Sequence, residues 1–191
     1  MRKNSFTVLA VLTAALSVFL STCKDAGELI QVEEGGPGII LPGVGMEGVK
    51  LGDSKEEVLS KLGNPTVIGF ADGQYRSWRS FDYYDGPHAG LAIDFLEEPD
   101  GSFGPVDAIA AATPSGTQYG GKTKEGIGIG SELKAVHQAY GMPEKTLNGG
   151  QGYIRDYYCA GKKEFIVGYQ DSLVTTMFIG YHVKMPNDYC E

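Results

Sequence analysis

A pattern that occurs twice limits the folds open to this chain more than any other feature. Residues 48–65 recur as residues 126–143, in one register and without a gap. Each copy has two apolar residues that alternate with other residues, then a Gly, a short amphipathic segment, and finally Gly-x-Pro. Gly just after a helix and Pro soon after it are common stop signals. The pattern therefore predicts a short helix near the start of each of two similar units.

The predicted helices should begin at a side-chain cap and bury one apolar stripe. In the first copy Asp53 is the expected N-cap, and Glu56 is expected to reach back to it as in a capping box. A stripe with helical spacing is typical of a helix that lies on a core. The expected stripes are Val58, Leu59 and Leu62 in the first copy and Leu133, Val136 and Tyr140 in the second.

After each predicted helix, the sequence takes on the alternation and the aromatic content that are typical of β-strands. Turn residues at 98–101 and 170–172 separate the apolar runs. The strands expected are 75–84, 91–95 and 106–112 in the first unit and 153–159, 164–169 and 173–183 in the second.

We therefore predict an α+β fold of two tandem repeats, residues 46–120 and 121–191. Each repeat should be a short helix packed on an antiparallel β-meander of about three strands. Because a unit of this size has only a small core, the two are expected to pack together.

The N-terminus has the features of an export signal. Arg2 and Lys3 precede an apolar run over residues 6–20, which is too short to span a bilayer comfortably. The run ends in Leu-Ser-Thr-Cys23, which resembles the bacterial lipobox, although Thr22 is larger than the usual residue. We expect a lipoprotein signal peptide at 1–22 and lipid attachment, palmitate included, at Cys23. An uncleaved anchor and ordinary secretion are the alternatives. The location expected is the cell envelope, at the outer membrane and facing the periplasm or the exterior.

Residues 23–45 are rich in Gly and Pro and predict a flexible tether, in which residues 39–41 could still dock as an edge strand. Residues 43–48 form a formal G-x-G-x-x-G. Because no convincing strand precedes this motif and no long helix follows it, we do not interpret it as a nucleotide site.

The chain has three cysteines, and acylation of Cys23 would leave two that can pair. Cys159 and Cys190 are then expected to form a disulfide in an oxidising compartment, with two free thiols as the alternative.

The net charge of −8 argues against nucleic acid as a partner, because neutralising phosphates requires Lys and Arg. The same charge argues against adhesion to an anionic lipid surface. His88, His137 and His182 lack any metal-ligand spacing, and no Ser lies in Gly-x-Ser-x-Gly, so no cofactor, metal or catalytic residue is expected.

The repeated motif also carries a resemblance. The stretch Gly48-x-x-Leu51-Gly52-x-Ser54-x-Glu56-x-Val58-x-x-x-Leu62-Gly63-x-Pro65, followed by aromatic strands, resembles the SmpA/OmlA (BamE-like) outer-membrane lipoproteins. The duplicated form is similar to the tandem β-lactamase inhibitory protein. Both families usually have a helix before the motif, where this chain has a Gly- and Pro-rich linker. The BamE-like family usually has one unit, where this chain has two.

The resemblance implies binding to a protein partner in the envelope rather than catalysis. The first hypothesis is a scaffold for outer-membrane assembly or integrity, the second an inhibitor or sequestering module for a secreted or periplasmic enzyme, and the third an unrecognised hydrolase. Aromatic side chains supply large contact areas at low entropy cost. The candidate partner-binding residues are Trp78, Tyr83, Tyr84, Tyr153, Tyr157 and Tyr158, some of which are expected to be core instead.

Overall fold

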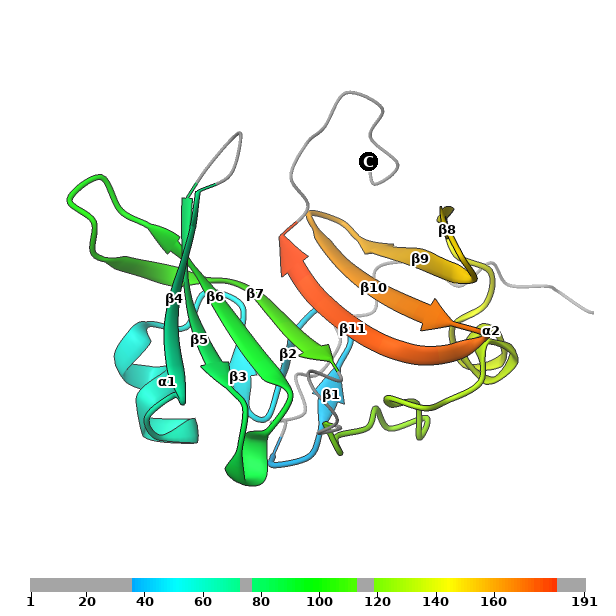
Figure 1. Ribbon diagram of the computed structural model, residues 1–191, viewed down its shortest axis with the longest axis horizontal. Helices are drawn as coiled ribbons and strands as arrows, with labels where there is room; N and C mark the ends of the chain where they lie inside the picture. The colour runs from blue at the N-terminus through cyan, green and yellow to red at the C-terminus, as the bar shows by residue number, and fades with distance from the viewer. Residues whose placement is uncertain (1–35, 73–76, 113–118, 182–191) are drawn as a thin grey trace, which may run out of the picture. The chain divides into compact units, whose positions relative to one another are not determined.

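A computed structural model describes residues 36–72, 77–112 and 119–181 of the chain (Figure 1). β-Strands hold more of these residues than any other element, and two α-helices accompany them, so the α+β class is confirmed. The helices are α1 (Lys55–Leu62) and α2 (Leu133–Tyr140). The signal peptide, Cys23, Cys190 and His182 lie outside the described residues, and their predictions stay predictions.

An antiparallel sheet of eight strands forms the body. Four strands follow each helix, where the sequence predicted about three. The strands after α1 are β4 (Val67–Asp72), β5 (Ser77–Tyr83), β6 (Leu91–Glu97) and β7 (Phe103–Ala112). The strands after α2 are β8 (Lys145–Gly150), β9 (Tyr153–Ala160), β10 (Lys163–Gln170) and β11 (Leu173–Tyr181).

The strand order is β4-β5-β6-β7-β11-β10-β9-β8, so the two four-strand series join through their last strands. In this joint Ala110 lies opposite Phe178 and Ile109 lies opposite Ile179. The first strands of the two series, β4 and β8, form the two edges of the sheet.

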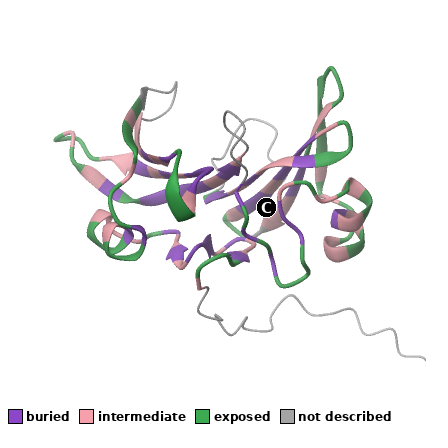
Figure 2. Ribbon diagram, turned by 60° about the horizontal axis from the view of Figure 1, so that its bottom comes forward, coloured by how far each residue is buried: buried purple, intermediate pink, exposed green. Residues whose placement is uncertain are grey.

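The core lies on one face of this sheet. Successive residues of a strand point to opposite faces, and residues in register across five neighbouring strands are buried on the same face. This row consists of Phe81, Ile93, Ile109, Ile179 and Phe165. Val58 and Leu62 of α1 and Val136 of α2 belong to the same apolar cluster. Figure 2 shows both helices on one side of the sheet.

A small second sheet packs into this core. Its strands are β1 (Ile40–Leu41), β2 (Gly45–Met46) and β3 (Val49–Lys50). β1 and Gly45 fall within residues 23–45, and Ile40 is fully buried. Ile40 N–H donates to the Lys122 carbonyl at 2.9 Å, and Lys122 N–H donates to the Gly38 carbonyl at 2.9 Å. The part of the predicted tether before residue 36 lies outside the described residues.

The cap of α1 is one residue later than predicted. Ser54, not Asp53, is the N-cap: its hydroxyl accepts from Glu57 N–H, and the Glu57 carboxylate, not that of Glu56, accepts from Ser54 N–H at 2.7 Å. Asp53 instead accepts from Lys50 N–H at 2.7 Å, which closes the turn before the helix. At α2 the N-cap is Glu132, which makes no side-chain capping bond.

The two helices are preceded by equivalent hydrogen bonds, made by glycines that are one sequence repeat (78 residues) apart. Gly52 N–H donates to the carbonyl of Val106 in β7 at 2.8 Å, and Gly130 N–H donates to the carbonyl of Val174 in β11 at 2.8 Å. In return, Val106 N–H donates to the Asp53 carbonyl and Val174 N–H donates to the Ser131 carbonyl, each at 2.8 Å. The segment before each helix is therefore tied to the last strand of its own series.

The helices also end alike. Gly63 and Gly141 follow them with φ angles of 76° and 82°, and their N–H groups bond to carbonyls four residues back at 2.9 and 3.0 Å. A positive φ is easy for Gly and strained for other residues, which explains why both copies of the motif hold Gly here.

Candidate functional site

The face of the large sheet that turns away from the core forms the candidate site, and we call it the open face. Its defining residues alternate with the buried rows. They are Trp78, Ser80, Asp82, Ala108, Ala110, Ala112, Tyr153, Arg155, Tyr157, Ile166, Thr176 and Phe178. The contacts of α1 with β7 and β3, and of Tyr140 in α2 with Phe165, lie on the other face.

The open face is hollowed on the β11 side of the joint. The hollow has a volume of about 370 Å³. Small residues of β7 and large residues of β9 and β11 line it together, so both four-strand series contribute to one surface. The lining residues are Ala110, Ala111, Ala112, Tyr153, Arg155, Glu164, Ile166, Thr176, Met177 and Phe178.

Tyr153 can lie across β10 because residue 168 has no side chain. A Cβ at Gly168 would meet the Thr176 hydroxyl and would lie 2.8 Å from the Tyr153 hydroxyl. Arg155 Nε donates to that hydroxyl at 2.9 Å, and the guanidinium lies 5.2 Å from the Tyr153 ring centroid. Gly168 thus leaves space for the Tyr153 ring at the hollow, and Arg155 fixes the ring with a hydrogen bond.

The hydrogen bond between Tyr153 and Arg155 shifts both groups in the direction that favours their charged forms. Burial alone would raise the pKa of Tyr153, but the bonds from Arg155 and Thr176 outweigh burial and lower it. The bond to Tyr153 raises the pKa of Arg155. Arg155 therefore stays cationic and presents a charge at the hollow.

The first series contributes a polar counterpart on the same face. Trp78 Nε1 donates to the carboxylate of Asp107 at 3.4 Å. Burial raises the pKa of the Asp82 carboxyl, and the Ser80 hydroxyl, at 3.3 Å, offsets part of that increase. The open face thus carries an acidic group over β5 and a cation over β9, and Trp78 bonds to the buried Asp107 of β7.

The structure separates the six aromatic candidates. Trp78, Tyr153 and Tyr157 share the open face, although Tyr157 is only 7% exposed. Tyr84 is exposed just beyond the end of β5.

Two candidates instead belong to the core. Tyr83 is buried, donates to the Gly63 carbonyl at 3.1 Å, and has its pKa raised to about 12 by burial. Tyr158 packs edge-on against Tyr140 of α2, with 5.8 Å between the ring centroids. Because Tyr157 and Tyr158 are consecutive in β9, they cannot both face a partner.

Arg155, Phe178 and the alanines of β7 were not predicted as site residues. Arg155 alternates with Tyr153 and Tyr157 in a predicted strand, so the period of two is a signal that could have found it. The alanines of β7 have no such signal, because their contribution is the space that they leave.

Two buried carboxylates each lie beside a histidine. Asp156 accepts from Thr146 Oγ1 at 2.6 Å and lies 2.8 Å from His137 Nε2. Glu47 accepts from Tyr119 Oη at 2.7 Å, and its second oxygen lies 3.5 Å from His88 Nδ1.

Burial, reinforced by Glu47, raises the pKa of Tyr119, so this phenol stays a hydrogen-bond donor. The two pairs join segments distant in sequence and lie apart from the hollow. Their positions fit a role in stability.

Cys159 forms a disulfide. Cys23 and Cys190 lie outside the described residues, so the pairing of Cys159 with Cys190 stays a prediction.

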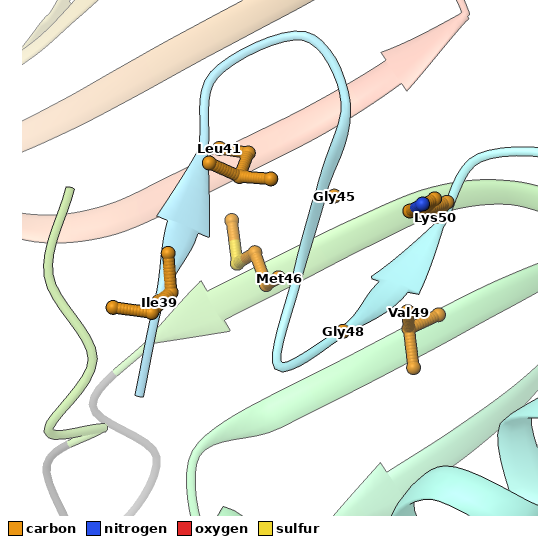
Figure 3. Close-up of a pocket in the computed structure, with 7 residues that line it drawn as sticks. All are labelled: Ile39, Leu41, Gly45, Met46, Gly48, Val49 and Lys50. Carbon is orange, nitrogen blue, oxygen red and sulfur yellow. The ribbon is translucent and has the colours of Figure 1, made fainter. Parts of the chain in front are cut away.

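The G-x-G-x-x-G at 43–48 lies in β2 and its flanking turns. A small pocket there is lined by Ile39, Leu41, Gly45, Met46, Gly48, Val49 and Lys50 (Figure 3). It has no room for a water molecule. A Cβ at Gly45 would collide with the Val49 carbonyl oxygen, so this Gly allows β2 and β3 to approach closely.

Within residues 36–72, 77–112 and 119–181, no helix is long and apolar enough to cross a bilayer. In the same part of the chain, no group of three His, Cys, Asp or Glu side chains could hold a metal ion.

No protein-family model and no curated protein sequence matches the chain. Solved structures with a similar arrangement include a DUF4309 family protein (YjgB) from Bacillus subtilis, with 14% identity, a TM-score of 0.48, and coverage of 72% of this chain and 84% of that one. A cysteine-rich secretory protein from Staphylococcus aureus has 13% identity, a TM-score of 0.47, and coverage of 73% and 46%.

A Streptococcus mutans protein described as a beta-lactamase inhibitor has 12% identity, a TM-score of 0.25, and coverage of 66% and 81%. With TM-scores below 0.5, these likenesses do not bear on function.

Proposed function

We propose that this protein is a lipid-anchored, non-catalytic binding module of the cell envelope, and that the open face holds its protein partner. The observation that carries the proposal is the hollow beside the β7–β11 joint. It combines aromatic side chains, small residues and the charged Arg155 in a single concave surface. Aromatic residues and Arg in such a setting are typical of the few side chains that dominate protein interfaces.

The surface is best explained by two copies of one helix-plus-four-strand unit. The 78-residue spacing relates Gly52 to Gly130 and Gly63 to Gly141, and each pair makes equivalent hydrogen bonds. In this interpretation the last strands of the two copies pair and extend one sheet across both. A tandem sheet of this kind is what the resemblance to the β-lactamase inhibitory protein implies, whereas the BamE-like lipoproteins usually have one unit.

The envelope location rests on the N-terminal sequence. An acylated Cys23 would keep the body at a membrane, and a protein partner in the same compartment would be met at a high effective concentration. The test of the anchor is metabolic labelling with palmitate: the parent chain is expected to take up the label, and Cys23→Ala is expected not to. A variant that is labelled as strongly as the parent would refute lipid attachment at Cys23.

A photoreactive phenylalanine analogue at Phe178 tests the binding surface in cells. Phe178 lines the hollow, whereas Met142, with 78% exposure, follows α2 and provides a matched control position. We expect one protein adduct that forms from position 178 and not from position 142. Adducts that are equal at the two positions would refute the open face as the binding surface.

The identity of the adduct also separates the hypotheses. Outer-membrane assembly proteins would indicate a scaffold role, and a single soluble enzyme would indicate inhibition. For the latter case, loss of the enzyme's activity at a one-to-one ratio is the confirming measurement.

A further inference from the structure

The outer edge of β4 is open. Within the part of the chain that the structure describes, β5 is the only strand that pairs with β4. In an antiparallel ladder alternate residues bond to opposite sides, so about half of the N–H and C=O groups of β4 point away from β5. Val67 is 43% exposed, and Ile68 and Phe70 are each 60% exposed. An exposed apolar edge of this kind is a template for pairing with another strand.

The other edge of the sheet is protected. β8 has the sequence Lys-Thr-Leu-Asn-Gly-Gly, and its register with β9 shifts between Asn148 and Gly150. Lys and an irregular register are devices that prevent pairing at an edge. β4 has neither: its sequence is Val-Ile-Gly-Phe-Ala-Asp, and its register with β5 is unbroken. The open edge is therefore particular to one end of the sheet.

We propose that β4 pairs antiparallel with β4 of a second copy of this chain, about a twofold axis at Gly69. The sequence around Gly69 is suited to this partner, because large apolar residues flank the Gly on both sides. In that register Ile68 of each copy lies opposite Phe70 of the other, and a β-branched residue opposite an aromatic one is a favourable cross-strand pair.

The faces also agree. Ile68 and Phe70 both lie on the face of β4 that carries the core, in register with Phe81 and Arg79 of β5. Among the described residues, α1 makes its main contacts with β7 and β3, and Ile68 and Phe70 stay exposed. The contact is isologous, so it closes as a dimer and joins the two sheets into one. It is small, and we expect a dimer that depends on concentration.

A charge exchange tests both the contact and its register. The double variants Ile68→Lys/Phe70→Lys and Ile68→Glu/Phe70→Glu place like charges opposite each other in a dimer of either variant alone. A heterodimer of the two variants places Lys opposite Glu in both 68–70 pairs of the contact. The substituted side chains are exposed, so the fold should be kept, and circular dichroism checks this. Sedimentation velocity of the full chain in non-ionic detergent measures the mass.

The parent chain should move from monomer to dimer as its concentration rises, each double variant should stay monomeric, and the mixture should dimerise again. Leu147→Lys, on the protected edge, is the matched control and should dimerise as the parent does. A parent chain that stays monomeric throughout, or a dimer that both double variants still form, would overturn the proposal.

A cysteine at the axis gives a second measurement in membranes. Gly69→Cys, combined with Ser80→Ala to make room for its Cβ beside Ser80 Oγ, should give a disulfide-linked dimer on a non-reducing gel. Leu147→Cys should not. Equal crosslinking of the two variants would contradict an axis at Gly69.

Discussion

The Ile109–Ile179 pair should make the two four-strand series unfold as one unit. These residues lie opposite each other in the β7–β11 joint, and each is 0% exposed. Replacing a buried Ile with Ala costs about 2–5 kcal/mol of unfolding free energy. A domain of this size has a total of about 5–15 kcal/mol, so either substitution removes a large share of it.

The single Trp makes this measurable. Trp78 lies in β5, whereas Ile179 lies in the other series. If the series share one core, Ile179→Ala should move the urea midpoint of Trp78 fluorescence as far as that of far-UV circular dichroism. Leu173→Ala, also in β11 but 47% exposed, is the control and should change stability by about 0.5 kcal/mol or less.

The double variant extends the test, because residues in contact show coupling. Ile109→Ala combined with Ile179→Ala should depart from the sum of the single effects by about 0.5–3 kcal/mol. An unchanged fluorescence midpoint of Trp78 in Ile179→Ala, together with an earlier transition in circular dichroism, would refute the shared core. That result would mean that the series unfold separately.

Three further predictions concern single positions. Ser54→Ala should lower stability by about 0.5–2 kcal/mol in urea unfolding, because it removes the α1 cap, whereas Glu132→Ala at the matching position of α2 should not; equal losses would contradict this. Gly168→Ala should displace the Tyr153 ring and cost about 1–3 kcal/mol through overpacking, measured in the same way; an unchanged midpoint would show that the ring does not need this Gly. Burial raises the pKa of the Asp82 carboxyl, so the folded state binds its proton more strongly than the unfolded state does. This contribution to stability is fully present below the unfolded-state pKa and is lost as pH rises through the folded-state pKa. Asp82→Asn should therefore be more stable than the parent at neutral pH and gain nothing in strong acid, and the opposite pH trend would disprove the assignment.

The helices could be predicted from their apolar stripes, and six of the eight strands of the large sheet from the alternation of apolar and polar residues. β4 and β8 could not, for physical reasons that differ. β4 has apolar residues on both faces and so lacks the alternation, and β8 is mostly polar or Gly. The predicted cap of α1 was one residue too early. Asp53 and Ser54 are both good caps, and only the backbone geometry decides between them.

The site could be predicted only in part. A period of two places Tyr153 and Tyr157 on one face and Tyr158 on the other, but the position of α2 decides which face is covered, and that is a tertiary contact. The buried carboxylate of Glu47 was not found, because its partner Tyr119 lies 72 residues away in the sequence. Local patterns carry no signal for such pairs.

The attachment of β1 to the body has a mechanical consequence. The described chain enters the fold at residue 36, and the bonds of Ile40 and Gly38 with Lys122 follow almost at once. Gly38 N–H also donates to the Glu47 carboxylate at 2.9 Å. A pull on the N-terminus, as from a fixed anchor, would load these few bonds before any strand of the large sheet. The two-residue β1 would peel away first, and the open face would keep its shape under tension.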